Sequence, residues 1–199
     1  MSESKRLFIG IELNQIHKEN LSETNKRIMM HLKEGRPTPR DNYHITLRFL
    51  GETKENRIPV IEEIMQEVAM KSQIFLTYMA DLDEFRKGDK STIWMGVKDQ
   101  EKLTEIRERL DEELEKLFYK KDPADYVPHI TLVRNGQYLE DVAGIEELKQ
   151  KMKLPKLPIL MDKLVLFESV KADEEQKYLN IYETPLSVKR VDGSPRVTE

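Results

Sequence analysis

The chain has 199 residues, of which 38% are hydrophobic and 35% are charged, and its formal net charge at neutral pH is −4. This charge excludes a global positive field that would gather nucleic acid from a distance, so any anionic ligand must be bound by local residues. The absence of cysteine excludes disulfides, thiolate metal sites and cysteine nucleophiles.

Apolar periodicity predicts strands and helices along nearly the whole chain. Strands are predicted at 6–13, 43–50, 73–85, 91–98, 128–134, 157–169 and 177–188. Helices are predicted at 16–35, where Gly35 is the expected stop, and at 56–71, 99–121 and 144–153. Residues 86–90 are typical of a hairpin tip, and about 187–199 are expected to be a flexible tail.

The irregular mixture of strands and helices favours an α+β fold with mainly antiparallel sheets. A helix, a strand and a further helix follow one another twice, which indicates a duplicated unit. Since no Gly/Ser linker separates the halves, we expect 1–199 to form one bilobal domain. No apolar run reaches the roughly 20 residues of a membrane span, and the N-terminus is unlike a signal peptide, so we predict a cytoplasmic protein without membrane contact.

The tetrapeptide His-Ile-Thr-Leu occurs twice, starting at His44 and at His129. Alternation along a strand places His44 and Thr46 on one face, and it does the same for His129 and Thr131. Two such strands related by an approximate two-fold axis would present two imidazoles and two hydroxyls to one cleft. A single His-x-Thr strand is ordinary strand composition, but two copies in matching places are a strong signal.

This set of groups suits reaction at a phosphodiester. A neutral imidazole can take a proton from water while a protonated one gives a proton to the leaving oxygen. The unperturbed pKa of histidine, about 6.5, lets both forms coexist near neutral pH. The threonine hydroxyls can donate hydrogen bonds to the non-bridging phosphate oxygens. No metal or cofactor is needed to complete this inventory.

The segments "NYHITLRFLGE" and "YVPHITLVR" resemble the two HxTx motifs of the 2H phosphoesterase superfamily. Within it, the chain is similar to the RNA 2′,3′-cyclic phosphodiesterases, long called 2′-5′ RNA ligases. The segments "RLFIGIEL", "IWMGV", "LVLFES" and "KYLNIYETPL" follow in the order of that family. The resemblance implies two α+β lobes, with mainly antiparallel sheets facing a central cleft and helices on the outside.

The resemblance also implies metal-independent hydrolysis of a ribose 2′,3′-cyclic phosphate to a 2′-phosphomonoester. In that reaction His44 would be the proton donor to the departing O3′ and His129 the proton acceptor that activates water. Thr46 and Thr131 would hold the phosphate. The direction of proton transfer is taken from the family, because the sequence itself does not distinguish the two histidines.

Three further residues are candidates for substrate binding. Arg48 shares a face with His44 on a straight strand, so it would reach the phosphate, orient His44, or pair with a carboxylate at the rim. Phe49 and Arg134 each lie five residues after their histidine, which points them away from the cleft unless a bulge turns them back. If it does, they would clamp a nucleobase by stacking and cation–π contact; otherwise Phe49 belongs to the core and Arg134 to the surface.

The expected partners are RNA 3′ ends or small cyclic-phosphate nucleotides, and we expect a monomer. A phosphodiesterase for a small cyclic nucleotide and a non-catalytic module that binds RNA ends are the alternatives. The matched histidines argue against a module that only binds. The reverse reaction, 2′-5′ ligation, would be weak because water competes. A metallohydrolase is disfavoured because the histidines lack a carboxylate pattern such as H-E-x-x-H.

Overall fold

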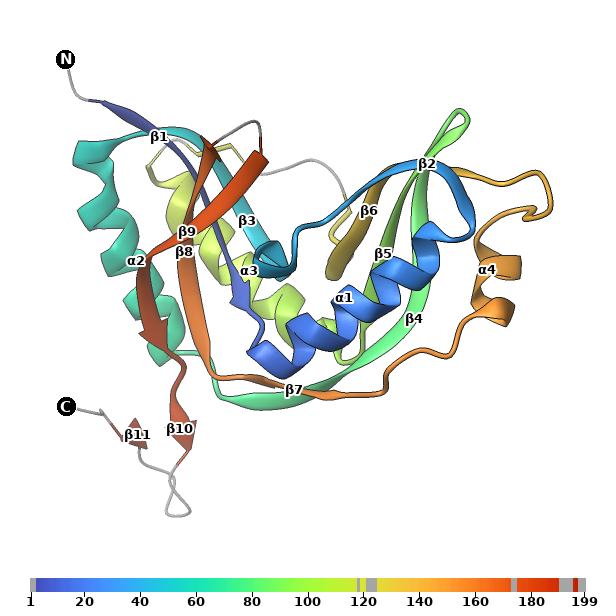
Figure 1. The fold of residues 1–199 in the computed structure, drawn as a ribbon. Coiled ribbons are helices and arrows are strands. Elements are labelled where there is room, and N and C mark those ends of the chain that lie inside the picture. Colours follow the sequence, from blue (N-terminus) through green and yellow to red (C-terminus); the bar gives the residue numbers. More distant parts are fainter. Residues whose placement is uncertain (1–2, 118, 121–124, 173–174, 190–194, 197–199) are drawn as a thin grey trace.

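The computed structural model describes residues 3–117, 119–120, 125–172, 175–189 and 195–196, arranged as two lobes (Figure 1). The first lobe holds a four-stranded sheet of order β3-β1-β8-β9. Its strands are β1 (Ser4–Glu12), β3 (His44–Lys54), β8 (Lys163–Ala172) and β9 (Glu175–Pro185). All of its neighbouring strands are antiparallel.

The second lobe holds a five-stranded antiparallel sheet of order β2-β6-β5-β4-β7. Its strands are β2 (Leu32–Pro37), β4 (Phe75–Lys87), β5 (Lys90–Val97), β6 (His129–Tyr138) and β7 (Pro158–Met161). The hairpin tip predicted at 86–90 joins β4 to β5, where Gly88 has the positive φ of 65° that a tight turn needs. The predicted α+β class with antiparallel sheets is confirmed.

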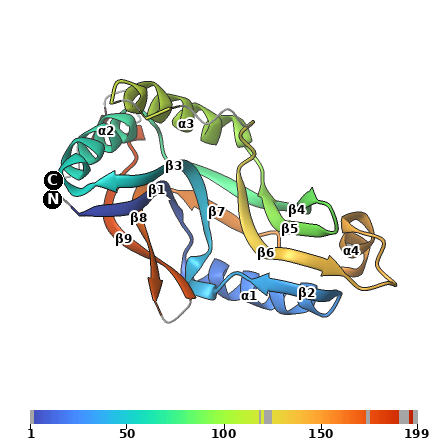
Figure 2. The ribbon, with the colours of Figure 1, turned by 90° about the horizontal axis from the view of Figure 1, so that it is seen from above.

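The helices interlock the two lobes. The helices are α1 (Gln15–Met29), α2 (Ile58–Met70), α3 (Gln100–Glu115) and α4 (Ile145–Lys151). Helix α1 follows β1 of the first sheet but packs on β2 and β6 of the second, whereas α3 follows β5 of the second sheet but packs on β3 and α2. Figure 2 shows α2 and α3 beside the first sheet and α1 beside β2. Each motif strand pairs with the strand that lies before the preceding long helix. Strand β3 pairs with β1, which precedes α1, and β6 pairs with β5, which precedes α3.

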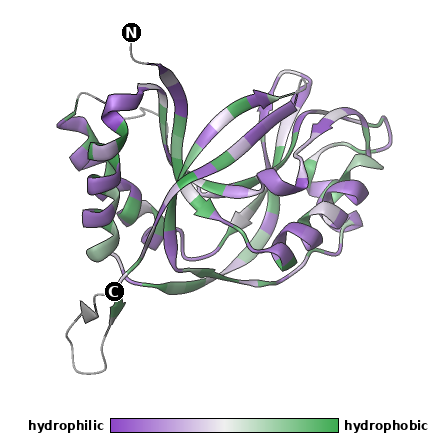
Figure 3. Cartoon of the chain, turned by 60° about the vertical axis from the view of Figure 1, so that its left-hand side comes forward, coloured by the Kyte–Doolittle hydropathy of each residue, from purple (hydrophilic) through white to green (hydrophobic). Residues whose placement is uncertain are grey.

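One hydrophobic cluster runs through both lobes and includes Ile45 and Leu47 of β3 together with Ile130 and Leu132 of β6. Figure 3 shows hydrophilic and hydrophobic residues intermixed along the outer helices, as expected for helices with one covered face. The apolar residues of the two motifs thus hold both strands against a common core. Within the described residues, no helix has the length and apolar composition needed to cross a membrane.

The helix predicted at 99–121 ends earlier, at Glu115, and two further predicted boundaries are wrong. The helix predicted at 16–35 ends at Met29, and Leu32–Pro37 forms β2 because its backbone pairs with β6. The strand predicted at 157–169 is two strands, β7 and β8, which belong to different sheets. In both cases the apolar spacing was compatible with a longer element, and only long-range pairing decided where it ended.

The tail predicted at 187–199 lies largely outside the described residues. Ser187 is anchored, since its backbone N–H donates to the carbonyl oxygen of Ser72 at 2.8 Å. Beyond it, Val188–Lys189 (β10) pairs with Pro195–Arg196 (β11).

Candidate active site

Each motif histidine begins its strand, and each ring is anchored in the same way. Nδ1 of His44 lies 2.7 Å from the carbonyl oxygen of Asn42, and Nδ1 of His129 lies 2.7 Å from that of Val127. A carbonyl oxygen only accepts, so Nδ1 carries the proton in both rings. In the neutral form, Nε2 is therefore the unprotonated nitrogen of each imidazole. The Nε2 of His44 is 2.9 Å from Oγ1 of Thr46.

A register shift at the same motif position re-aims the residues that follow. In the β1–β3 ladder Ile9 pairs with Arg48 and Gly10 with Thr46, so Leu47 is an extra residue. In the β5–β6 ladder Ile93 pairs with Val133 and Trp94 with Thr131, so Leu132 is the extra residue. Such bulges break the strict alternation of side chains.

The bulges place Phe49 and Arg134 on the faces that carry the histidines. Phe49 pairs with Phe8, whose ring lies 4.8 Å from that of His44. Both Phe49 and Arg134 are exposed, Phe49 by 60%. The sequence predicts this direction only if a bulge turns the two residues back, and both strands contain that bulge.

The prediction that Arg48 shares the face of His44 is wrong, because the bulge at Leu47 turns Arg48 toward the helices. Nε of Arg48 lies 2.6 Å from Oδ1 of Asp111 on α3. Arg107, one turn before Asp111, lies 3.4 Å from the other carboxylate oxygen. All three side chains are buried. Arg48 still borders the cleft, but its guanidinium is held by the carboxylate behind it.

This buried ion cluster connects α3 to both motif strands. The guanidinium of Arg107 lies over the ring of Tyr126, 4.6 Å from its centroid. The Tyr126 hydroxyl donates to the backbone carbonyl of Thr46 at 2.9 Å. The segment that leads into the second motif is thereby tied to the backbone of the first.

A cleft of about 320 Å³ lies beside Thr46 and His129. Its lining residues are Thr46, Leu47, Arg48, Phe49, Phe85, Arg107, Asp125, Tyr126, Val127 and His129. Phe49 and Phe85 are residues partly open to solvent, 60% and 44% exposed. The cleft thus offers aromatic faces next to a histidine and a threonine of the two motifs.

The two imidazoles have different surroundings. His44 is enclosed by rings from three strands, with centroids 4.8 Å away for Phe8, 5.7 Å for Phe167 and 5.0 Å for Tyr178. His129 meets Phe85 at 5.1 Å and Trp94 at 5.5 Å.

Burial is the main cause that lowers both histidine pKa values. The pKa of His44 is lowered to about 4, first by burial and then by the charges of Arg134, His129 and Lys18, against the opposing effect of the Asn42 carbonyl. The pKa of His129 is also lowered, first by burial and then by Arg134. Both shifts favour the neutral form of each ring at pH 7.

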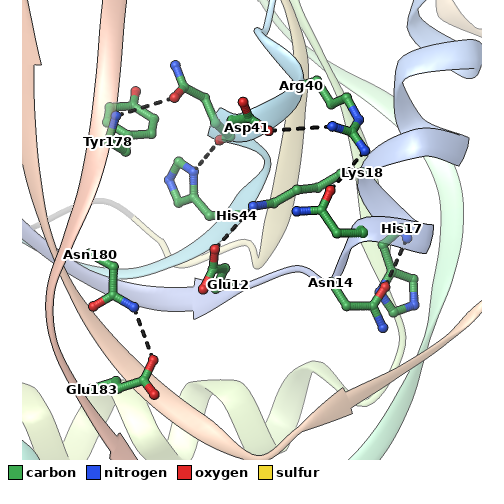
Figure 4. Close-up of polar contacts among 12 residues, drawn as sticks. Glu12, Asn14, His17, Lys18, Arg40, Asp41, His44, Tyr178, Asn180 and Glu183 are labelled. Atoms are coloured by element: carbon green, nitrogen blue, oxygen red, sulfur yellow. Dashed lines mark hydrogen bonds and ion pairs between the residues drawn. The ribbon is translucent and has the colours of Figure 1, made fainter.

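Asn42 joins the two edges of the curled first sheet. Its Nδ2 donates to the carbonyl oxygen of Gln176 at 2.5 Å, and the N–H of Tyr178 donates to its Oδ1 at 3.3 Å. Gln176 and Tyr178 lie on β9, at the edge opposite β3. Asn42 thus holds β9 over His44 while its own carbonyl fixes the ring. Figure 4 shows Tyr178 on one side of His44 and the Lys18–Glu12 ion pair, 3.1 Å long, on the other.

Sequence reasoning missed Asn42, Asp111, Arg107 and Phe85. Asn42 lies two residues before His44, and no local pattern distinguishes it from any turn asparagine. The helical spacing of Arg107 and Asp111 is typical of a surface pair, and only the packing of α3 on β3 buries it. Among the described residues, no group of three or more His, Cys, Asp or Glu is placed to hold a metal ion.

The chain matches the model of the 2′-5′ RNA ligase superfamily over residues 19–173. It is 30% identical over 182 residues to the RNA 2′,3′-cyclic phosphodiesterase of Archaeoglobus fulgidus, covering 82% of this chain and 99% of that protein. It is 26% identical to the protein of the same name from Thermotoga maritima, covering 89% of this chain and 94% of that one.

Solved structures show the same fold. E. coli LigT in apo form superposes with a TM-score of 0.70 at 21% identity, covering 93% of this chain and 99% of that one. A Thermus thermophilus protein superposes with a TM-score of 0.74 at 19% identity, covering 91% and 97%. The architecture is that of a LigT-like α+β protein.

The chain belongs to the 2′-5′ RNA ligase superfamily and is an enzyme of that superfamily. The predicted resemblance to the 2H phosphoesterases is thereby confirmed.

We predict that Asp111→Ala lowers the free energy of unfolding by about 3–5 kcal/mol, because it leaves Arg48 and Arg107 buried without their counter-ion. Urea denaturation followed by circular dichroism measures this change. Glu113→Ala, which removes the partner of the exposed Lys116 on the same helix, is the control and should change stability little. A similarly small effect for both variants would contradict the structural role of Asp111.

We predict that Asn42→Ala raises the pKa of His44 from about 4 toward 6.5, because a released β9 lets water reach the ring and relieves the penalty of burial. An NMR titration of the His44 ring proton measures it. Gln176→Ala is the control, because Asn42 bonds the backbone carbonyl of Gln176 and not its side chain, so the substitution keeps this bond. An unchanged His44 pKa in the Asn42 variant would refute this prediction.

Proposed function

We propose that this enzyme hydrolyses the 2′,3′-cyclic phosphate at RNA 3′ ends to a 2′-phosphomonoester without a metal, using His44 and His129 as acid and base. The observation that carries the proposal is the matched anchoring of both rings through Nδ1, which leaves each Nε2 for the substrate. The names of the A. fulgidus and T. maritima relatives support the same reaction. A solved LigT structure that holds 3′-AMP supports a nucleotide ligand.

In the proposed reaction, Nε2 of His129 accepts a proton from water while the water oxygen bonds to phosphorus. The bond between phosphorus and O3′ breaks, and protonated His44 donates its Nε2 proton to O3′. The products are a 2′-phosphomonoester and a free 3′ hydroxyl. His129 is left protonated and His44 neutral, and proton exchange with solvent restores the starting pair.

The threonines hold the non-bridging phosphate oxygens in this proposal. Oγ1 of Thr46 lies 2.9 Å from Nε2 of His44, so a phosphate that reaches this nitrogen also meets the hydroxyl. Thr131 is the corresponding residue of the second motif, two positions after His129 on the same face. Hydroxyls fixed on strands stabilise the charge that develops on phosphate at little cost in reorganisation.

The low pKa of His44 does not exclude its function as the acid. A bound phosphate anion raises the pKa of each neighbouring imidazole, because it favours the charged form. The substrate therefore supplies the charge that makes protonated His44 accessible. Bound phosphate also opposes the charge of Arg134, which lowers the pKa values of both histidines.

The remaining candidates take supporting functions. Phe49, exposed at the cleft that Phe85 also lines, would stack on the nucleobase, and Arg134 would close the clamp from the second motif strand. Arg48 is a positioning residue in this proposal, acting through Asp111 on the geometry of β3. Monomeric state, cytoplasmic location, one bilobal domain and weak reverse ligation stay predictions from the sequence.

We predict a bell-shaped profile of kcat/KM against pH with both limbs below 6.5, since both free-enzyme pKa values are lowered. Below about pH 4 both rings are protonated and the base is lost; above the pKa of His129 both are neutral and the acid is lost. The limbs of kcat should lie at higher pH, because bound phosphate favours the imidazolium. Steady-state rates on a short RNA with a 2′,3′-cyclic phosphate test this, and a flat profile would count against paired histidines.

We predict that His44→Ala and His129→Ala each lower kcat by about 10²–10⁴-fold. His31→Ala, which changes a histidine outside the two motifs, is the control and should retain full activity. Product analysis should give the 2′-phosphomonoester, and excess EDTA should leave the rate unchanged. Near-normal turnover by either motif variant would overturn the mechanism, and binding without turnover by the wild type would indicate a non-catalytic RNA-end module.

A further inference from the structure

Two arginines lie directly opposite each other at the edge of the second sheet. Arg36 on β2 pairs with Arg134 on β6, and both side chains are exposed. Residues directly opposite in an antiparallel ladder have Cβ atoms about 4.5–5.5 Å apart on one face, and like charges there are destabilising. The sheet therefore holds an unfavourable pair at this position.

No acidic side chain relieves this repulsion within the described part of the chain. Neither Arg36 nor Arg134 has an ion pair there, although Glu34 lies two residues before Arg36 on the same strand. Arg40, four residues further on, differs clearly: its guanidinium lies 3.0 Å from Glu19 and bonds Gln15 at 2.8 Å. Because Arg36 and Arg134 lack such a counter-ion, this position at the sheet edge favours binding of an anionic ligand.

The pair continues the proposed phosphate site outward from the cleft. The bulge at Leu132 puts Arg134 on the face of His129 and Thr131, and its partnership with Arg36 puts Arg36 on that face too. Strand β2 is the edge strand beyond β6, as Figure 2 also shows, so Arg36 is one strand further from the histidines than Arg134. Adjacent strands are about 4.8 Å apart. Positive charge thus extends from Arg134 on β6 to Arg36 at the open edge of β2.

We propose that Arg36, beside Arg134, binds the internucleotide phosphate that lies next to the cyclic phosphate in an RNA strand. This proposal rests on the proposed function and defines its substrate class as oligonucleotides rather than free cyclic nucleotides. A mononucleoside 2′,3′-cyclic phosphate has no such phosphate and leaves Arg36 without a ligand. The guanidinium fork binds phosphate through two N–H groups and keeps its charge at every working pH.

The net charge of −4 makes a local site of this kind necessary for a polyanionic substrate. Since Arg36 is remote from the reacting phosphorus, its contact is the same in the ground state and in the transition state. Its loss should therefore raise KM and leave kcat unchanged.

The test compares three substrates: a nucleoside 2′,3′-cyclic phosphate, a dinucleotide ending in the same group, and that dinucleotide with an uncharged methylphosphonate linkage. The wild type should favour the charged dinucleotide over the other two by about 10- to 100-fold in kcat/KM, the range of a charge-assisted hydrogen bond. Arg36→Ala should abolish this preference through KM and change the rate on the mononucleotide by less than about twofold. Arg36→Lys keeps the charge but loses the guanidinium fork, so its preference for the charged dinucleotide should lie between those of the wild type and Arg36→Ala.

Arg27→Ala is the matched control, because it removes the same charge from α1, where Arg27 bonds the carbonyl of Lys153. It should retain the dinucleotide preference. The Arg36→Ala variant should also melt no lower than the wild type, since it removes a like-charge pair. For the dinucleotide, the slope of log kcat/KM against log salt concentration should become shallower by about one unit.

Equal rates of the wild type on all three substrates, or an Arg36→Ala variant that keeps the preference, would overturn the proposal while leaving the hydrolytic function intact. Absence of hydrolysis of every cyclic phosphate would instead overturn the proposed function.

Discussion

The site depends on one repeated interaction, the hydrogen bond from Nδ1 of each motif histidine to the carbonyl oxygen two residues earlier. That bond is 2.7 Å long at both His44 and His129. It fixes the tautomer and the ring orientation from within the local chain, so the strand that carries the histidine also aims it. Other features of the cleft act on these two histidines. The bulges turn the following residues toward the face of the histidines. At His44, aromatic rings exclude water and nearby cations lower the pKa of the ring.

The duplication gives two similar motif strands, but their surroundings differ. Asn42 clasps β9 over His44, whereas Val127, at the same position before His129, has no side-chain amide to do so. His44 therefore lies in a closed aromatic enclosure, while His129 borders an open cleft. A pair of imidazoles in unequal environments can divide acid and base functions between them. The asymmetry thus comes from the elements around the motifs rather than from the motifs.

The charged groups of the structure serve different purposes at different depths. Arg48, Arg107 and Asp111 are buried together, and their ion pairs fix α3 against the first motif strand. Arg36 and Arg134 lie at an open sheet edge with no counter-ion in the described chain, which makes them available to an anionic ligand. Proteins commonly accept such unfavourable surface arrangements where binding needs them. A chain of net negative charge can in this way present a local positive surface.

The sequence by itself determined the antiparallel α+β class, the two His-x-Thr strands and the family, because these depend on local periodicity and on short motifs. The direction of Arg48, the division of 157–169 between two sheets and the end of α1 at Met29 depended on long-range pairing, which no local pattern encodes. The same is true of the contacts of Asn42 with β9, which join residues 134 and 136 positions apart in the chain. It is also true of the Arg36–Arg134 pair, whose members are 98 positions apart. Tertiary structure decided these features because contacts between distant residues fix which face a side chain takes and what lies opposite it.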